Sequence, residues 1–537
     1  MTHTTATSGR TNPPQQTRWD KAFNTIEVIG NKLPEPFTLF LILFLITGVA
    51  STVMHYMGVS VLVPGKDELT INGLFTGEGM TWLTTNLGKN YIGFPPLLTV
   101  MPILLAVGVA ERSGMLSALV RKLFATAKKW TLPYAVGIVG VSASIMADSA
   151  FVVIPPLAAM VFKAAGRHPV AGLLGGFAAV GAGYSTSFFP TSLDALFAGI
   201  TNAVMQTLPG TAATEVNPVS NFYFNFFSAL ILGLLSGFIT DRILEPRMEK
   251  IGVPTEETIS TEDAKTRGDR DEEGNELSPQ LSTIENKALW MSLFASFVLT
   301  VVIMASVLVP ISPWRNETGQ FLPKSPLLDS IVFIVFAYFM VMGIAYGAVM
   351  RTIKGMPDVV KMMGLAMKDM IEFLVLAFIL GQFVALFSWT GIGTFTAVKG
   401  AAFLESMHLT GFIAILAFII LASCLNLLVI SGSAMWTLMA AVFVPMFALL
   451  GYEPAFVQAA FRVGDSATQV MTPLNPYMIV ILGLLRRYEP QAGLGTLMSR
   501  LVPFVVPFWM AWVLMLFGWY VLDLPLGPGA GILIPNQ

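Results

Sequence analysis

Charged residues are scarce in this sequence of 537 residues, of which 12% are charged and 54% are hydrophobic. A soluble domain carries roughly a quarter charged residues, so the composition excludes an ordinary soluble globular protein. Long runs contain no charge, and each can cross the ~30 Å hydrocarbon core of a bilayer as a helix. Examples are residues 36–54, 222–240, 288–311, 331–350 and 501–522. The sequence therefore predicts an all-α polytopic membrane protein.

Cysteine, histidine and the common catalytic motifs are also sparse. The single Cys424 excludes an intramolecular disulfide framework. The four histidines form no His-Glu-x-x-His zinc site, and the chain has neither a Gly-x-Ser-x-Gly elbow nor a Walker A loop. The "VGD" at 463–465 superficially resembles the Gly-x-Gly-Asp motif of membrane aspartyl proteases, but Arg462 stands where that motif needs glycine. We therefore expect a protein that is not an enzyme.

The amino-terminal residues 1–32 are polar and rich in Ser, Thr and Pro. They contain no short apolar core followed by a small-residue cleavage site, which indicates a cytosolic tail and not a signal peptide. The second expected span, around 91–110, is followed by five basic residues, whereas the loop before it shows no basic excess. Basic residues near span ends favour the cytoplasmic side, so we expect the amino terminus to be inside.

A charged segment divides the chain into two membrane halves, 33–249 and 288–522. Residues 250–287 are highly charged and nearly free of aromatic side chains, which leaves too little apolar surface for folding alone. We interpret this segment as a cytosolic linker. Residues 523–537 form a carboxy-terminal tail without a basic residue, which is compatible with an outside terminus.

The two halves share three landmarks in the same order. The first half has "VSAS" at 141–144, "GRHP" at 166–169 and "VGAGYSTSFFP" at 180–190. The second half has "ISGS" at 430–433, "GYEP" at 451–454 and "VGDSATQVMTP" at 463–473. Transporters use repeats of opposite topology to place broken helices at a shared interface, where freed backbone groups hold solute and ions. We predict an inverted repeat whose two Val-Gly segments are interrupted helices that face each other near mid-membrane.

Four charged residues fall within or beside these apolar segments: Asp148, Asp194, Arg462 and Asp465. A charge at the bilayer centre is costly and needs a partner or a function. Arg462 and Asp465 could form an ion pair on a helix surface, lie near the headgroups, or hold a substrate carboxylate and a cation or proton. Asp194 could contact solute or cap the next helix. Asp148 could cap a helix or have a structural role in a helical hairpin.

The segment 431–481 resembles the AbgT family, the p-aminobenzoyl-glutamate transporters. The resemblance rests on "SGSAMW", "GYEPAFVQAAFRVGDS" and "TPLNPY", and in the first half on "GVAERSG" at 108–114 and "DALFAGIT" at 194–201. It implies a dimeric transporter of the bacterial inner membrane, with about nine transmembrane helices, re-entrant hairpins and an architecture similar to the divalent-anion sodium symporters. It also implies p-aminobenzoyl-glutamate transport and efflux of p-aminobenzoate-like antimetabolites, including sulfonamides.

Carried onto this sequence, the resemblance implies the following substrate-binding residues: Asp194, Ser433, Trp436, Pro454, Arg462, Asp465 and Pro473. It implies a sodium site at Asn426 and Asp465. An aromatic ring could stack on Trp436 while Arg462 binds the carboxylate, although Trp436 could instead anchor a helix at the membrane interface. Expected partners are a small aromatic carboxylate, the lipid bilayer and a second copy of the chain. We expect no nucleic acid and no cofactor besides sodium or protons.

Two other kinds of membrane protein fit part of the pattern. A sodium-coupled dicarboxylate symporter shares the expected architecture, and a passive anion channel would also need polar groups at membrane depth. No filter repeat is present, and duplicated broken helices suit alternating access better. The working hypothesis is therefore an ion-coupled transporter in which Asp465 partly neutralises Arg462 when the site is empty.

Overall fold

The computed structural model describes residues 34–62, 68–146, 149–208, 212–256, 280–309, 311–322, 324–409, 411–429, 431–472 and 474–534. Within these ranges regular structure is almost entirely helical, apart from one antiparallel pair of strands, β1 (Ser60–Leu62) and β2 (Glu68–Thr70). The predicted all-α membrane architecture is confirmed. The amino-terminal tail 1–32, the linker centre 257–279, Asp148 and Pro473 lie outside the described residues.

Eight described helical segments are long and apolar enough to cross a membrane, against about nine spans expected from the sequence. Five shorter apolar helices of 10–17 residues accompany them. The eight segments are Pro36–Tyr56, Gly77–Arg112, Phe222–Ile251, Thr283–Leu308, Ile331–Met350, Ile371–Trp389, Gly432–Leu449 and Leu494–Leu522.

In the first half, several helices begin with a proline in the first turn, where the missing N–H is not needed. The helices are α2 (Pro36–Tyr56), α3 (Gly77–Ile92), α4 (Pro95–Arg112), α5 (Met115–Ala125), α6 (Leu132–Ser142), η1 (Ala143–Met146), α7 (Ser149–Ala164), α8 (Pro169–Ala182), α9 (Ser192–Met205), α10 (Phe222–Ile239), η2 (Thr240–Leu244) and α11 (Glu245–Ile251).

The second half begins at a capping box, in which Ser282 and Glu285 satisfy each other's backbone N–H groups. Its helices are α13 (Thr283–Leu308), α14 (Pro326–Asp329), α15 (Ile331–Met350), α16 (Met356–Asp369), α17 (Ile371–Trp389), α18 (Ile392–Ser406), α19 (Phe412–Asn426), α20 (Gly432–Leu449), α21 (Pro454–Ala467), η3 (Gln469–Met471), α22 (Tyr477–Tyr488) and α23 (Leu494–Leu522).

The same local pattern occurs in both halves. A short apolar helix, a break and a second helix form a hairpin, which is α6–α7 in the first half and α19–α20 in the second. A helix interrupted by irregular chain follows, which is α8–α9 in the first half and α21–α22 in the second. The prediction that both Val-Gly segments are interrupted helices is therefore confirmed.

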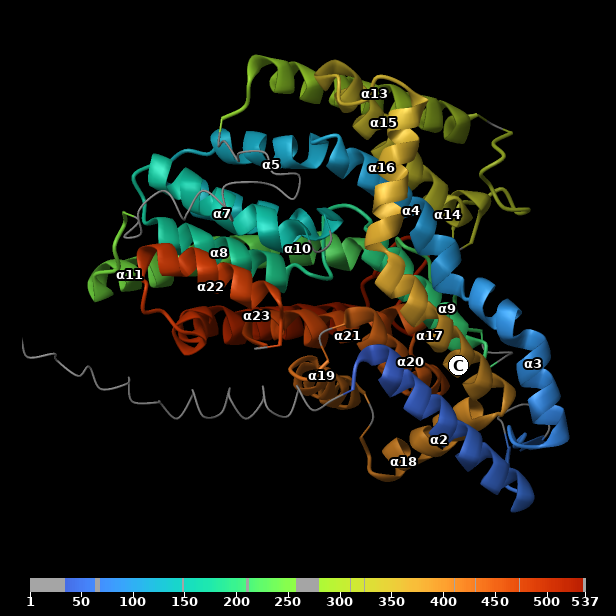
Figure 1. Ribbon diagram of the computed structural model, residues 1–537. Helices are drawn as coiled ribbons and strands as arrows, with labels where there is room; N and C mark the ends of the chain where they lie inside the picture. Colours follow the sequence, from blue (N-terminus) through green and yellow to red (C-terminus); the bar gives the residue numbers. More distant parts are fainter. Residues whose placement is uncertain are drawn as a thin grey trace, which may run out of the picture.

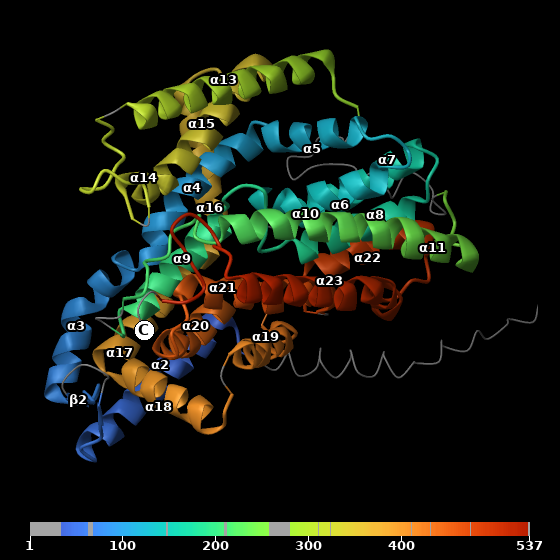
Figure 2. The same cartoon turned by 180° about the vertical axis from the view of Figure 1, so that it is seen from behind.

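The helices form two sets that cross each other. Figure 1 shows α7, α8, α10, α22 and α23 stacked with a roughly common direction, while α4, α9, α16 and α17 run obliquely across one end of the stack. The view from behind in Figure 2 shows the same arrangement, with α13 and α15 on one outer side and α18 and α19 on the other. The break between α8 and α9 carries the chain from the first set into the second.

Small residues allow the helices of the stack to pack closely. A Cβ atom on Gly137 of α6 would lie 2.1 Å from the carbonyl oxygen of Gly233 on α10, so the two backbones are in contact there. Without a strong hydrophobic force between helices in lipid, such close backbone packing is the usual way in which membrane helices associate. A larger residue at Gly137 would separate the two helices.

The carboxy-terminal tail folds back onto the turn between α20 and α21. Within the described part of the tail, Ile532 accepts a hydrogen bond from the backbone N–H of Glu453, and Ile534 donates one to Gly451. Ile532 and Ile534 are buried. The tail therefore holds the "GYEP" turn in place.

Candidate functional site

Arg462 on α21 is the centre of the candidate site. Its side chain is 1% exposed. One terminal guanidinium nitrogen, Nη1, donates to the backbone carbonyl of Ser185 at 2.6 Å, and the other, Nη2, lies 2.8 Å from Asp194 Oδ1. The guanidinium carbon also lies 5.2 Å from the centre of the Phe197 ring. The positive charge of this buried arginine is therefore balanced by a carboxylate, a carbonyl and an aromatic ring. The arginine also lies close to two breaks in the chain.

The expected direct ion pair between Arg462 and Asp465 is wrong, because Asp194 is the salt-bridge partner of Arg462. The Asp465 carboxylate still attracts the guanidinium electrostatically, without direct contact. Helical side chains lean toward the amino terminus of their helix. Arg462 accordingly lies over the preceding turn, where Nη2 donates to Gln458 at 3.3 Å, and points away from Asp465 in the following turn. Both Arg462 and Asp465 are buried, so neither belongs to a surface ion pair or a headgroup contact.

Asp194 has two structural roles at once. It occupies the first turn of α9, where Thr191 Oγ1 accepts from its backbone N–H and its Oδ2 accepts from the Thr191 N–H at 2.7 Å. Its other oxygen, Oδ1, faces Arg462 and accepts from Asn225 Nδ2 at 3.1 Å. The alternative that Asp194 caps a helix is thus observed, and the cap also fixes the carboxylate that neutralises Arg462. A substrate role for Asp194 stays a prediction.

Asp465 and Asn426 are brought together as the sequence suggested. Asn426 Nδ2 donates to the backbone carbonyl of Asp465 and, at 2.8 Å, to Thr468 Oγ1. The close approach requires Gly464, because a Cβ there would lie 2.5 Å from Ala422 on α19. The two hydrogen bonds donated by Nδ2 therefore fix the orientation of the Asn426 amide, and Oδ1 stays available as an acceptor.

Among the described residues, four buried oxygens on α19, α21 and η3 have no hydrogen-bond partner. They are both carboxylate oxygens of Asp465, Asn426 Oδ1 and Gln469 Oε1. A buried acceptor without a donor is costly, and a hard cation such as sodium or a proton on the carboxylate would satisfy it. The described residues contain no cluster of three or more His, Cys, Asp or Glu for a transition metal. The donor set therefore fits a hard monovalent cation or a proton.

Trp436 is buried in a polar and aromatic network instead of at the membrane interface. It is 0% exposed, and its indole N–H lies 3.3 Å from the Phe197 carbonyl and 3.2 Å from Thr201 Oγ1. Its ring lies 4.6 Å from the Phe461 ring, centre to centre. The interfacial-anchor alternative is excluded by this burial. Stacking of a substrate on Trp436 stays a prediction, and it would require the surrounding rings to move.

Ser433 and Pro454 stand at the starts of their helices. Ser433 lies in the first turn of α20 beside Gly432, whose added Cβ would lie 3.5 Å from Asp465 Oδ2, so this turn adjoins the carboxylate. Pro454 begins α21 two turns before Arg462, and this separation corresponds to ~12 Å along the helix axis.

Next to Pro454, Glu453 is buried, and its burial raises the pKa of its carboxyl although Thr214 donates two hydrogen bonds to it. Pro454 therefore fixes the entry of α21 without contacting Arg462.

The two interrupted helices meet where their regular structure stops. The hydroxyls of Ser185, after α8, and Ser466, near the end of α21, are hydrogen-bonded to each other. A Cβ on Gly181 of α8 would lie 2.3 Å from Val470 of η3. The prediction that the two breaks face each other is confirmed, and the two-fold axis in the membrane plane stays a prediction.

Joining Ser185 and Ser466 by a disulfide tests this contact. We expect the Ser185→Cys/Ser466→Cys variant, made in a Cys424→Ser background, to form an intramolecular disulfide on mild oxidation, because the two hydroxyls are in hydrogen-bond contact. Mass spectrometry of the digested protein would identify the bond. The matched pair Ser185→Cys/Ser292→Cys, with Ser292 on α13, should stay reduced. A bond in the control pair, or none in the test pair, would contradict this packing.

Several residues of the site were missed by sequence reasoning. Gln458 accepts from Asn221 at 2.6 Å and donates to Thr201 at 3.1 Å, so it joins α21 to α9 and α10. Asn225 donates to Asp194, and Gln469 Oε1 is one of the four oxygens on α19, α21 and η3 that lack a partner among the described residues. Their one sequence signal is a polar amide within an apolar segment. Such a signal shows that a residue needs a partner without showing which partner it has.

The repeat is asymmetric in its chemistry. When the Val-Gly pairs are superposed along the sequence, Ala182 stands in the first half where Asp465 stands in the second. Both oxygens of the Asp465 carboxylate lack a hydrogen-bond partner among the described residues, whereas the partnerless oxygens of the first-half site residues, Asn221 Oδ1 and Asn225 Oδ1, belong to neutral amides. The repeats therefore share a backbone pattern, while the candidate cation site belongs to one of them.

The chain is similar in sequence to a known family of membrane transporters. The family model "AbgT putative transporter family" matches residues 21–534. The p-aminobenzoyl-glutamate transport protein of Escherichia coli (strain K12) is 34% identical over 521 residues, covering 96% of this chain and 98% of that protein.

Two solved structures are similar in fold and sequence. The YdaH transporter of Alcanivorax borkumensis has a TM-score of 0.84 and 32% identity, over 92% of this chain and all of that one. MtrF of Neisseria gonorrhoeae, described as illuminating a class of antimetabolite efflux pumps, has a TM-score of 0.84 and 35% identity, over 95% of this chain and all of that one. These relatives are transporters and not enzymes.

Proposed function

The chain belongs to the AbgT family of multi-pass membrane transporters, and on that premise we propose that it is an ion-coupled secondary transporter of p-aminobenzoyl-glutamate and p-aminobenzoate-like aromatic carboxylates. The proposed substrates include sulfonamide antimetabolites, in line with the efflux described for MtrF. We place the protein in a bacterial inner membrane as a homodimer, with the amino terminus in the cytoplasm.

The observation that carries this proposal is the buried guanidinium of Arg462 beside two helix breaks. Its Nε lacks a hydrogen-bond partner within the described part of the chain, while the terminal nitrogens are held by Asp194, Ser185 and Gln458. A carboxylate oxygen bound at Nε would form a charge-assisted hydrogen bond. We propose that this nitrogen is the first contact of the substrate carboxylate, and that Asp194 keeps the arginine neutralised until the carboxylate arrives.

Ion coupling is supported by the oxygens of Asp465, Asn426 and Gln469 that have no hydrogen-bond partner in the described part of the chain. A cation or proton bound there satisfies the buried acceptors and adds a positive charge on the same helix as Arg462. The added charge favours entry of an anionic substrate. The two binding events would then promote each other, as coupled transport requires.

Flux into proteoliposomes tests the proposed function. Labelled p-aminobenzoate and p-aminobenzoyl-glutamate should move against their own gradients when a sodium or a proton gradient is imposed, each gradient being applied separately. The gradient that drives accumulation identifies the coupling ion. Substrate movement in the same direction as the ion indicates symport, and movement in the opposite direction indicates antiport. Equal flux with and without both gradients would point to a passive channel, and absence of flux for both compounds would contradict the proposed substrates.

A further inference from the structure

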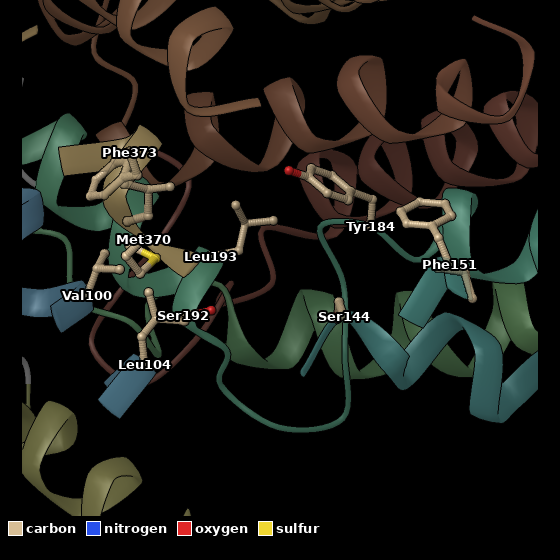
Figure 3. A pocket seen from close by; sticks show the side chains of 11 residues that line it. Val100, Leu104, Ser144, Phe151, Tyr184, Ser192, Leu193, Met370 and Phe373 are labelled. Atoms are coloured by element: carbon tan, nitrogen blue, oxygen red, sulfur yellow. The ribbon is translucent and has the colours of Figure 1, made fainter. Parts of the chain in front are cut away.

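A mostly apolar cavity of about 180 Å³ lies next to the site, between α4, α7, the break of α8–α9 and the junction of α16 with α17. In Figure 3, Met370, Phe373 and Val100 lie at one end of the cavity, Tyr184 and Phe151 at the other, and Leu193 between them. The described lining residues carry no charge, and their polar groups are hydroxyls of Ser144, Tyr184 and Ser192.

This cavity adjoins the residues that hold Arg462. Tyr184 lines it, and the next residue, Ser185, accepts the 2.6 Å hydrogen bond from Arg462 through its carbonyl. Ser192 and Leu193 line it at the start of α9, and the next residue is Asp194, the ion partner of Arg462. The cavity and the guanidinium therefore share two short stretches of chain as a common wall.

The cavity suits an aromatic ring in both size and lining. An apolar protein cavity of about 150 Å³ is large enough to bind benzene. Two hydroxyls could receive an aromatic amine: Ser144 donates to the Thr186 carbonyl at 2.8 Å and keeps its lone pairs, and Ser192 Oγ makes no hydrogen bond to any described residue. Trp436, by contrast, is fully buried against Phe461 and does not line this cavity.

We propose that this cavity, and not the face of Trp436, receives the aryl ring of the substrate, with Leu196, Tyr184 and Phe373 setting the accepted ring size. The proposal deepens the proposed function and rests on it for the identity of the natural ligand. The ring is bound by apolar contact and the carboxylate by Arg462. Ring size and acid group are therefore recognised by different residues and can be changed independently.

Filling the cavity tests the proposal with two probes, uncharged aniline and p-aminobenzoate. Leu196→Trp should weaken binding of both by about tenfold or more in isothermal titration of the full-length protein in detergent, because the ring loses its buried apolar contact. The matched control is Leu308→Trp, at a side chain of α13 that is 70% exposed, and it should bind both probes as the wild type does. Equal affinities in the two tryptophan variants would overturn the proposal.

Enlarging the cavity gives an independent test that does not depend on folding of Leu196→Trp. Phe373→Ala should raise the affinity for 4-amino-1-naphthoate relative to p-aminobenzoate by about tenfold, because it opens space at the end of the cavity marked by Phe373. An unchanged ratio would overturn the proposal.

The proposed function and the proposed aryl cavity can fail separately. Aniline binding that depends on Leu196, without any flux of p-aminobenzoate or p-aminobenzoyl-glutamate, would refute the proposed function and leave the aryl cavity standing. Flux of these substrates with aniline binding that is absent or insensitive to Leu196→Trp would refute the cavity and leave the function standing.

Discussion

Replacing Arg462 by alanine is expected to destabilise the protein by about 3–5 kcal/mol and to abolish binding of p-aminobenzoate. The substitution leaves the carboxylate of Asp194, whose side chain is 5% exposed, buried without its cation. It also removes the donor to the Ser185 carbonyl. Denaturant unfolding in detergent micelles, together with isothermal titration of p-aminobenzoate, would measure both effects.

A double variant separates the stabilising role of Arg462 from its binding role. Adding Asp194→Asn to Arg462→Ala removes the uncompensated charge but keeps an oxygen that can accept from the Thr191 N–H, while the new NH2 can donate to Asn225 Oδ1, which has no partner among the described residues. Most of the lost stability should therefore return, while binding stays lost. The matched control is Arg242→Ala, which removes an arginine that is 70% exposed and paired with Asp241, and it should be nearly neutral. An Arg462→Ala protein as stable as the wild type would contradict the buried ion pair.

Replacing Asp465 by asparagine is expected to abolish gradient-driven accumulation of substrate, lowering it to the level of vesicles without protein. Asparagine has nearly the same shape but carries neither the negative charge nor the second acceptor oxygen that a cation or proton requires. Both carboxylate oxygens of Asp465 lack partners among the described residues, so the change breaks no described side-chain hydrogen bond. Flux into proteoliposomes under sodium and proton gradients would measure the loss.

The matched control for Asp465→Asn is Asp523→Asn at the exposed end of α23. Asp523 has a backbone φ of 48°, which asparagine also adopts readily, so this variant should fold and transport normally. Unchanged accumulation in the Asp465→Asn protein under both gradients would remove Asp465 from the coupling mechanism.

Much of the fold could be predicted because the bilayer reduces the number of solutions. An apolar run long enough to span the membrane must be helical, since no water satisfies its backbone there. The breaks were visible as Gly, Pro and hydroxyl residues inside apolar segments, and the repeated "GRHP" and "GYEP" turns marked the order of hairpin and interrupted helix. These are local signals, which can be recognised in a single sequence.

The partner of Arg462 could not be predicted from local signals. Spacing along α21 placed Asp465 within one turn, but spacing does not say which way a long side chain leans. Asp194 is remote in the sequence, and its contact with Arg462 depends on how α9 begins after the first break. The same applies to Gln458 and Asn225, whose partners come from other helices. Residue types were thus predictable, whereas the pairing of residues on different helices was set by tertiary packing.

The central claim, that Arg462 binds the substrate carboxylate while the ring is bound elsewhere, is tested most directly by Arg462→Lys. Lysine keeps the positive charge beside Asp194 but loses the planar fork that contacts Ser185, Asp194 and Gln458. Isothermal titration of wild type and variant with p-aminobenzoate and with uncharged aniline gives four affinities. We predict weaker binding of p-aminobenzoate and unchanged binding of aniline. Equal weakening of both ligands, or of neither, would show that Arg462 is not the carboxylate partner.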